Sequence, residues 1–286
     1  MKILITGLNG YLGSLISNEL GKQGHQVSGI SRSLLYGPVS ELSVAIKSAD
    51  VVINLAGAPI LQRWTDKNKD EIYESRIKTI TNLVAAINRL KPEDQPKKFI
   101  SASAIGIYKA GITHNEESTE FDDGFLGMVV GDWEKPLQNL PVGTRKIVFR
   151  IGLVIGKNAK TIKKQLLPFK LGLGAKIGSG HQPFPFIHEK DVVQAFVWAV
   201  EKYEDNNTFN LVAPENINNK EFTTAFAQQL NRPAFFSIPE FAIKLVLGKA
   251  SVLLTQSPQV LSGKIQKAGF RFKYPDISSA LQEIIG

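Results

Sequence analysis

The chain contains no cysteine and only four histidines among its 286 residues. Without cysteine it can form no disulfide framework, thiolate zinc site or iron–sulfur cluster, and it has no cysteine nucleophile. None of the histidines has a partner at the spacing of metal ligands, so we expect no metal. The lack of cysteine also fits a reducing compartment.

Long apolar runs are absent as well. No run approaches the ~18–20 residues that a membrane helix needs. The first residues, Met1–Thr6, lead directly into a strand-like segment without the apolar region or cleavage site of a signal peptide. We therefore expect a cytoplasmic protein that has no membrane partner.

The charges are unbalanced, with 34 basic residues, 26 acidic residues and a formal net charge of +8. From Arg232 to the end, seven basic residues stand against three acidic ones, but they are scattered through apolar, periodic segments. This pattern favours a solvated basic face, or a phosphate-bearing ligand, over a nucleic-acid surface. We expect no nucleic-acid partner.

Short apolar runs alternate with helical periodicity in the first half of the chain. Strands are predicted at 2–6, 26–30, 51–55, 97–102 and 146–151, and helices at 11–22, 66–90 and 125–139. Strands and helices that alternate at this spacing predict an α/β fold with a Rossmann-type, doubly wound parallel sheet.

The rhythm changes after Gly156. We predict a dinucleotide-binding domain over 1–156 and a smaller, mainly helical substrate domain over 157–286, with the chain returning to the large sheet near 184–212. Further helices are predicted at 159–171, 189–203, 220–230, 239–247, 257–268 and 276–285, and short strands at 184–188, 208–212 and 270–272. Four glycines between 172 and 180 indicate a flexible loop that could serve as a lid.

A Gly-x-x-Gly-x-x-Gly turn links the first strand to the first helix. Gly7 permits a tight turn, Gly10 lets the backbone approach a pyrophosphate, and Gly13 lets the helix pack close to the sheet. The free N–H groups at the start of the helix attract phosphate. The predicted cofactor contacts of this turn are Thr6, Gly7, Asn9, Gly10, Tyr11, Leu12 and Gly13.

The end of the second strand indicates which dinucleotide binds. NAD sites carry an acidic residue there for the ribose 2′-hydroxyl, but no acidic residue occurs from Leu20 to Ser40. Ser31 and Arg32 follow the strand instead, and an arginine pairs with a 2′-phosphate that a carboxylate would repel. We predict NADP(H) as the cofactor.

Small residues stand at the ends of the third and fourth strands, where ligands bind in such folds. They leave room for a cofactor across the strand ends. The predicted contacts are Asn54, Leu55, Ala56 and Gly57 on the third strand, and Ser101, Ala102 and Ser103 on the fourth.

The glycine turn and these strand ends resemble the extended short-chain dehydrogenase/reductase superfamily, and within it the NAD(P)-dependent epimerases and dehydratases. More specifically, the chain resembles an atypical branch of epimerase-family proteins. The residues that carry this resemblance are Ser75-Arg76, 101–108, Trp133-Glu134, 150–156, 168–182 and 186–191. The segment 232–286 resembles that branch's C-terminal domain of unknown function. The resemblance implies an NADP(H)-dependent oxidoreductase or epimerase that acts on a small carbonyl or sugar-like substrate.

One departure from the superfamily concerns its Tyr-x-x-x-Lys motif, whose tyrosine transfers a proton. No tyrosine of this chain has a lysine four residues later. The resemblance places Ser103 at the active-site serine position, and we predict Tyr108 as a replacement acid and Glu134 as a base. The resemblance also implies that Arg76, Glu71 and Leu153 lie beside the cofactor.

Two functional interpretations follow from these residues. An NADP(H)-dependent enzyme would transfer a hydride between nicotinamide and a small-molecule substrate in the cleft between the domains. A dinucleotide-binding sensor or scaffold without turnover would explain the missing Tyr-x-x-x-Lys pair. Either interpretation is compatible with a homodimer.

Overall fold

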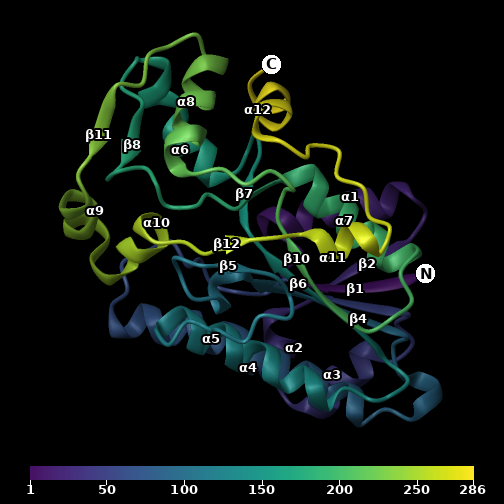
Figure 1. Cartoon of the computed structure of the whole chain (residues 1–286). Helices are drawn as coiled ribbons and strands as arrows, with labels where there is room; N and C mark the ends of the chain where they lie inside the picture. The colour runs from purple at the N-terminus through teal and green to yellow at the C-terminus, as the bar shows by residue number, and fades with distance from the viewer.

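The computed structural model describes all 286 residues and has a six-stranded parallel sheet at its centre (Figure 1). The strands lie in the order β10-β6-β4-β3-β1-β2. Their bounds are Lys2–Thr6 (β1), Gln26–Ile30 (β2), Val51–Asn54 (β3), Lys98–Ala104 (β4), Arg145–Ile151 (β6) and Asn207–Leu211 (β10). The predicted Rossmann-type sheet is confirmed, and β10 pairs with β6 at its edge.

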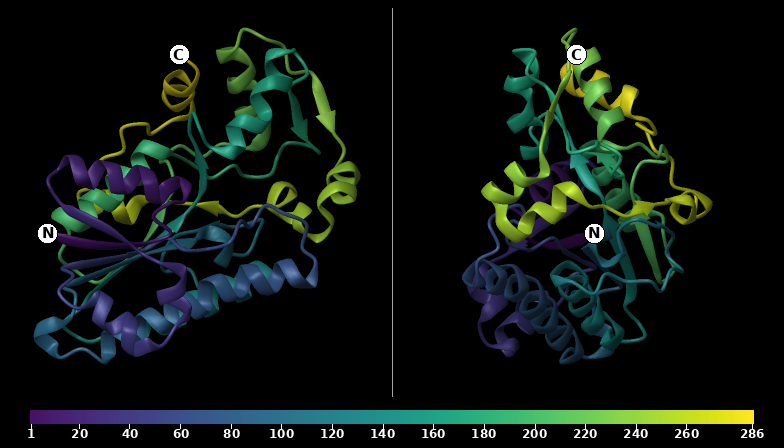
Figure 2. Two further views of the ribbon diagram at one scale, coloured as in Figure 1. Left: turned by 180° about the vertical axis from the view of Figure 1, so that it is seen from behind. Right: turned by 60° about the vertical axis from the view of Figure 1, so that its left-hand side comes forward.

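Helices cover both faces of the sheet (Figures 1 and 2). One face carries α1 (Tyr11–Lys22) and α7 (Glu189–Glu201), which pack against each other. The other face carries α2 (Arg32–Tyr36), α3 (Val39–Ile46), α4 (Asp66–Asn88), α5 (Phe125–Glu134) and the 3₁₀ turn η3 (Lys135–Asn139). The sheet and both layers share one core of 38 buried apolar residues.

The strand order reverses beside β1. This strand pairs with β2 on one side and with β3 on the other. Ligands bind at such a switch point in open α/β sheets, outside the carboxyl ends of the strands. The chain between β2 and β3 forms only α2 and α3, so it adds no further strand on that side.

A smaller lobe follows β6 and has its own core of 15 buried residues. It contains β7 (Leu153–Ile155) paired with β9 (Phe186–His188), and β8 (Ala175–Ile177) paired with β11 (Phe236–Ile238). Its helices are α6 (Lys160–Lys170), α8 (Asn219–Gln229), α9 (Glu240–Leu247) and α12 (Ile277–Ile285). A capping box of Asn218 and Glu221 begins α8.

The C-terminal segment belongs to both cores. Ile265 and Phe270 pack into the core of the large sheet, whereas Leu281 and Ile284 pack into the core of the smaller lobe. Between α9 and these residues the chain forms α10 (Val252–Thr255) and the short strand β12 (Gln259–Val260), which pairs with β5 (Thr113–His114). The segment therefore ties the two lobes together.

Two predicted elements at this end are wrong. The helix predicted over 257–268 is reduced to α11 (Gly263–Lys267), because Pro258 interrupts the helix and β12 takes the residues after it. The strand predicted over 270–272 is an irregular segment in which the Phe270 and Phe272 rings meet edge to face, with their centroids 5.0 Å apart. None of the helices is both long and apolar enough to cross a bilayer.

Candidate functional site

The glycine turn after β1 packs against its own backbone and against the end of β3. Gly7 has a φ of 70°, and a Cβ there would lie 3.0 Å from the carbonyl group of Leu55. A Cβ on Gly13 would lie 2.8 Å from the carbonyl oxygen of Leu8 and closer still to that of Gly7. Only glycine fits at these two positions, so the turn packs closely against the start of α1 and against the end of β3.

Helix α1 begins at this turn without a side-chain hydrogen bond that caps its N-terminus. Gly10 is the N-cap, no side chain bonds to the first N–H groups, and the first turn has no acidic residue. Such a helix start favours an anion. Asn9 is exposed, Leu12 is half-buried, and the Tyr11 hydroxyl is buried without a hydrogen-bond partner. The turn therefore offers free donors to a pyrophosphate.

A ladder of buried polar side chains crosses β1, β3 and β4. Thr6 Oγ1 donates to Asn54 Oδ1 over 2.7 Å, and Asn54 Nδ2 donates to Ser101 Oγ over 3.3 Å. Thr6 Oγ1 also accepts the N–H groups of Leu55 and Ala56 at 3.1 and 3.2 Å. These three side chains fix the strand ends from inside, so any cofactor contact at these positions comes from the main chain.

The residues after β2 present an unpaired cation. The Ser31 hydroxyl caps α2 by accepting the Leu34 N–H over 3.3 Å. Arg32 is exposed, forms no ion pair, and its guanidinium carbon lies 5.8 Å from the centre of the Tyr36 ring. A phosphate at this strand end would therefore meet a free guanidinium and no carboxylate.

Arg76 lies on α4 against the loop that follows β3. Its guanidinium donates to the main-chain oxygens of Ile72 and Ala58, at 3.0 Å each, and lies over the Trp133 ring at 5.2 Å. No carboxylate pairs with it, and burial lowers the pKa of Arg76 to about 10. A Cβ on Gly57 would lie 3.1 Å from the guanidinium carbon. The arginine is therefore a half-buried cation, still charged at neutral pH, beside the strand ends.

Glu71 does not join this group. It lies five residues before Arg76, which is about 140° around an α-helix, and its side chain is exposed. The indole of Trp133 is the better-placed polar group, because its Nε1 is buried and has no hydrogen-bond partner. The sequence did not predict a cofactor role for Trp133. Whether its Nε1 has a hydrogen-bond partner depends on the packing around it, which the sequence does not show.

Ser103, Glu134 and Arg150 form one hydrogen-bonded group near the ends of β4 and β6. Ser103 Oγ donates to Glu134 Oε1 over 2.5 Å, and Arg150 donates to both carboxylate oxygens at 2.9 and 2.7 Å. Burial alone would lower the pKa of Arg150, but the hydrogen bonds and charge of Glu134 outweigh it and raise that pKa. The bidentate pair fixes the orientation of the carboxylate beside the serine.

Tyr108 faces the interior on the other side of Arg150. It is 2% exposed, and its hydroxyl donates to Asn210 Oδ1 and accepts from Arg150 Nη1, both at 2.8 Å. Burial raises the pKa of Tyr108, and Arg150 opposes that rise. A hydroxyl engaged twice in the interior is not presented to a ligand, so this placement does not support Tyr108 as the replacement acid. Its geometry is that of a group that positions Arg150.

Arg150 and Asn210 are two further residues to which the sequence assigned no role. Ser103, Arg150 and Asn210 are register partners across β4, β6 and β10, so the sheet places them side by side. Arg150 could have been found from the sequence, because a charged residue inside an otherwise apolar central strand needs a partner. Asn210 gave none, since its place next to Arg150 depends on the pairing of two distant strands.

The two remaining predicted contacts lie at strand ends. Ala102 is buried in β4 between Ser101 and Ser103. Leu153 is half-buried in β7, directly after β6, and its N–H donates to the Pro185 oxygen over 2.8 Å. The geometry is compatible with both residues lining the site.

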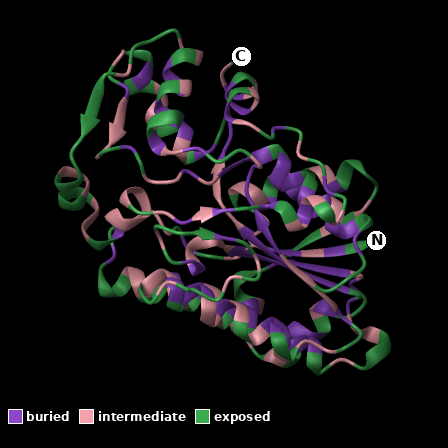
Figure 3. Cartoon of the chain, in the orientation of Figure 1, coloured by how far each residue is buried: buried purple, intermediate pink, exposed green.

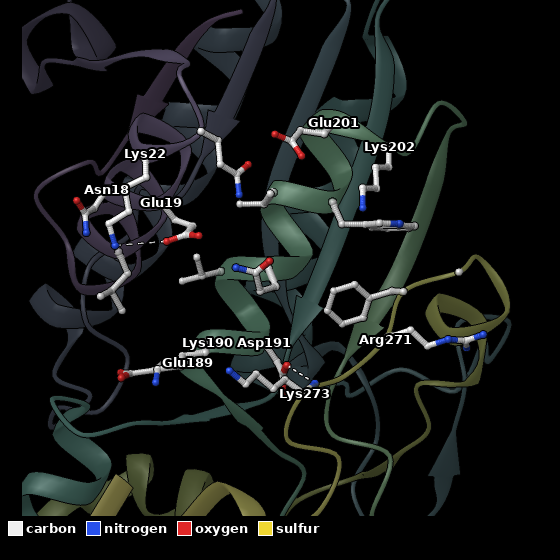
Figure 4. A pocket seen from close by; sticks show the side chains of 18 residues that line it. Asn18, Glu19, Lys22, Glu189, Lys190, Asp191, Glu201, Lys202, Arg271 and Lys273 are labelled. Atoms are coloured by element: carbon white, nitrogen blue, oxygen red, sulfur yellow. Dashed lines mark hydrogen bonds and ion pairs between the residues drawn. The ribbon is translucent and has the colours of Figure 1, made fainter. Parts of the chain in front are cut away.

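A large groove lies elsewhere, between α1, α7 and the segment Gly269–Lys273 (Figure 4). Its volume is about 740 Å³, and no predicted site residue lines it. Several of its charged groups already have partners, since Lys22 pairs with Glu19 and Asp191 accepts the N–H groups of Lys273 and Tyr274. We therefore place the candidate site at the carboxyl ends of the strands and not in this groove.

Comparison with known proteins gives matches over most of the chain. Residues 3–124 match the NAD dependent epimerase/dehydratase family, and residues 238–284 match a domain of unknown function, DUF1731. The epimerase family protein YfhF of Bacillus subtilis is 34% identical over 304 residues, which cover 100% of this chain and 98% of the relative. Human epimerase family protein SDR39U1 is 32% identical over 294 residues and the full length of both chains.

Solved structures extend the comparison to three dimensions. The crystal structure of human SDR39U1 (isoform 2) with NADPH superposes with a TM-score of 0.92 at 32% identity, over 100% of this chain and 99% of that one. A UDP-N-acetylglucosamine 4-epimerase from Bacillus cereus superposes at 0.77 with 18% identity, over 99% and 98% of the two chains, and so shows the fold alone. The chain therefore belongs to the NAD dependent epimerase/dehydratase family, among the epimerase family proteins that resemble it over their whole length.

Proposed function

We propose that this chain binds NADP(H) and is an oxidoreductase or epimerase-like enzyme that acts on a small carbonyl or sugar-like substrate. The observation that carries the proposal is the Ser103–Glu134–Arg150 group, which lies near the carboxyl ends of β4 and β6, at the same edge of the sheet as the glycine turn after β1. The NADPH in the human relative supports the choice of cofactor.

The residues present fit a phosphorylated dinucleotide. The close-packed glycine turn and the uncapped α1 suit a pyrophosphate, and Arg32 suits a 2′-phosphate. Arg76 supplies a second unpaired cation, next to an indole Nε1 that still needs an acceptor. Bound NADP(H) would supply or accept a hydride, and the chain's own groups would handle the proton.

Ser103 is the proposed contact to the substrate oxygen. In the oxidation direction it accepts the hydroxyl proton of the substrate and passes its own proton to Glu134, to which it is already hydrogen-bonded. In the reduction direction the proton moves the opposite way. Arg150 keeps the carboxylate aimed at the serine. Tyr108 accepts a hydrogen bond from Arg150 and donates one to Asn210, which fixes Arg150 on its other side.

A second candidate is an NADP(H)-binding sensor or scaffold without turnover. The observation in its favour is that each charged group of the proposed catalytic end has an internal partner, and that Tyr108 is buried. The two candidates share the cofactor and differ only in whether Ser103 meets a substrate.

Titration with NADPH and NADH, followed by tryptophan fluorescence, tests the cofactor first. Trp133 lies under Arg76, so a bound phosphate there should change its emission. We expect NADPH to bind more tightly than NADH. Equal affinities would overturn the choice of NADP(H), and no binding of either would overturn the whole proposal.

Screening carbonyl substrates for loss of NADPH absorbance then separates the two candidates. Turnover that falls at least about a hundredfold in Ser103→Ala and Glu134→Gln, with NADPH affinity retained, would support the enzyme. Glu93→Gln, at an exposed glutamate that precedes β4, is the matched control and should keep full activity. Turnover that is unchanged in Ser103→Ala would remove the proposed proton path.

A further inference from the structure

Two segments that are distant in sequence form the outer part of the smaller lobe. We call residues 157–180 and 230–249 the distal segments. Their strands β8 and β11 pair in parallel, and Arg232 Nε donates to the Lys170 oxygen over 2.9 Å. Figure 1 shows α6, β8, β11 and α9 along one edge of the molecule. The distal segments therefore make one continuous part of the surface.

The distal segments carry the net charge of the whole chain. They contain nine basic residues and one acidic residue, Glu240, which gives +8. The chain as a whole also has +8, so the rest of it holds 25 basic and 25 acidic residues. None of the nine basic side chains forms an ion pair within the chain. This positive charge is therefore concentrated and uncompensated.

The same segments also carry exposed apolar side chains. Of the sixteen large apolar residues exposed on the chain, nine lie here. Leu167 on α6 and Leu171 directly after the helix are both exposed and lie four residues apart, and Lys163 and Lys164 are exposed one turn before Leu167. Phe235, which precedes β11, is 88% exposed, and Figure 3 shows β11 itself exposed. An exposed apolar patch within a basic face indicates an interaction site.

We propose that the distal segments dock this protein on an anionic lipid surface. Lysines at a bilayer interface meet acidic headgroups, while leucines and phenylalanines enter the boundary of the acyl chains. A second copy of the same face would bring uncompensated positive charges together. A nucleic acid would satisfy the lysines but would leave Leu167 and Leu171 facing phosphates. Lipid is the occupant that matches both the charge and the apolar side chains.

Docking of this kind needs no helix that spans the bilayer. It differs from our sequence-based expectation of no membrane partner, which considered apolar runs alone. The sequence alone does not show that the basic residues of the distal segments form one surface. Residues 157–180 and 230–249 are separated by 49 residues and become neighbours only through β8 and β11.

Vesicle flotation with the full chain tests the proposal. We expect binding to vesicles of phosphatidylcholine mixed with phosphatidylglycerol, little binding to phosphatidylcholine alone, and release by salt. Lys163→Glu/Lys164→Glu should weaken binding by at least about thirtyfold, since each basic residue contributes about 1 kcal/mol at an anionic surface. Leu171→Ser/Phe235→Ser should weaken binding without changing its salt dependence.

Matched controls reverse two charges or replace two exposed apolar side chains elsewhere on the chain. Lys67→Glu/Lys91→Glu and Val44→Ser/Val142→Ser alter exposed residues of the other lobe and should bind like the unchanged protein. Thermal unfolding verifies that every variant is folded. Equal binding to both kinds of vesicle, no binding to either, or tighter binding to nucleic acid than to the anionic vesicles would each overturn the proposal. So would concentration-dependent dimerisation that Leu171→Ser/Phe235→Ser abolishes.

Discussion

Near the carboxyl ends of the strands, Arg76 and Arg150 both lie away from bulk solvent, but only Arg150 has a carboxylate partner. Glu134 holds Arg150 in a bidentate pair, whereas Arg76 bonds only to main-chain oxygens. Their pKa values move in opposite directions. Burial lowers the pKa of Arg76 to about 10, while at Arg150 the hydrogen bonds and charge of Glu134 overcome the effect of burial and raise the pKa.

The contrast separates two uses of an arginine. A paired guanidinium is satisfied inside the protein and positions its neighbours, as Arg150 does for Glu134 and Ser103. An unpaired guanidinium keeps its charge for a ligand, which at Arg76 and Arg32 we propose to be the phosphates of NADP(H). A charged side chain can therefore be assigned to structure or to binding by asking what already neutralises it.

The largest expected effect comes from Arg150→Met. It leaves the Glu134 carboxylate without its counter-charge, and breaking a buried pair in this way costs about 3–5 kcal/mol of unfolding free energy. Urea denaturation measures it. Arg145→Met in the same strand is the matched control, because Arg145 and its partner Glu204 are exposed, and exposed pairs contribute about 1 kcal/mol or less. Equal losses in the two variants would contradict the structural role of Arg150.

Next in size is Arg32→Ala. If this guanidinium binds the 2′-phosphate, the variant should lose about 1.5–3 kcal/mol of NADPH binding, or about ten- to a hundredfold in affinity. The affinity for NADH, which lacks that phosphate, should not change. Isothermal titration with both dinucleotides measures the difference. A parallel loss for both would show that Arg32 does not read the 2′-phosphate.

Arg76→Met should weaken dinucleotide binding without the loss of stability expected for Arg150→Met. We expect NADPH and NADH to weaken together, by roughly tenfold for the loss of one charged hydrogen bond. The unfolding free energy of the free protein should hold or rise, because the variant removes a half-buried charge that has no counter-ion. A loss of stability as large as that of Arg150→Met would refute the distinction between the two arginines.

The smallest expected effect is on the pH dependence of the unfolding free energy, through His188. This side chain is buried and has its partner in the smaller lobe. Its Nε2 lies 2.8 Å from Glu283 Oε2. Burial lowers the pKa of His188 despite the opposing charge of Glu283. A base whose pKa is lower in the folded state stabilises the fold fully above its unfolded pKa of about 6.5, and that contribution is lost as the pH falls below it.

His188→Gln should therefore flatten the dependence of unfolding free energy on pH between neutral and mildly acidic conditions. Thermal melts over this range measure the slope. Glu189, whose pKa burial raises, contributes with the opposite sign and is unchanged in the variant. An unaltered slope would mean that another group controls the acid sensitivity of this lobe.

The elements predicted best are those that local sequence specifies. β1, β2 and α1 have the predicted bounds, because short apolar runs, helical spacing and flanking glycines mark these residues. The missed strands β5, β7, β8, β11 and β12 have two or three residues each. Such segments carry no period of their own and become strands only when a distant partner supplies the hydrogen bonds.

The candidate site divides in the same way. The glycine turn and Arg32 could be found from the sequence, since each depends on the residues next to a single strand. The pairing of Arg150 with Glu134 and the burial of Tyr108 could not, because they depend on how α5 and β10 are placed against β6.

By itself, the sequence determined the parallel α/β fold, the glycine turn that approaches the end of β3, and the lack of an acidic residue after β2. Each of these follows from backbone freedom or charge at adjacent positions. The tertiary structure decided which arginine is neutralised, which tyrosine is buried, and that two distant basic segments share one surface. These are properties of pairs, and a pair exists only once the sheet order and strand register bring its members within a few ångströms of each other.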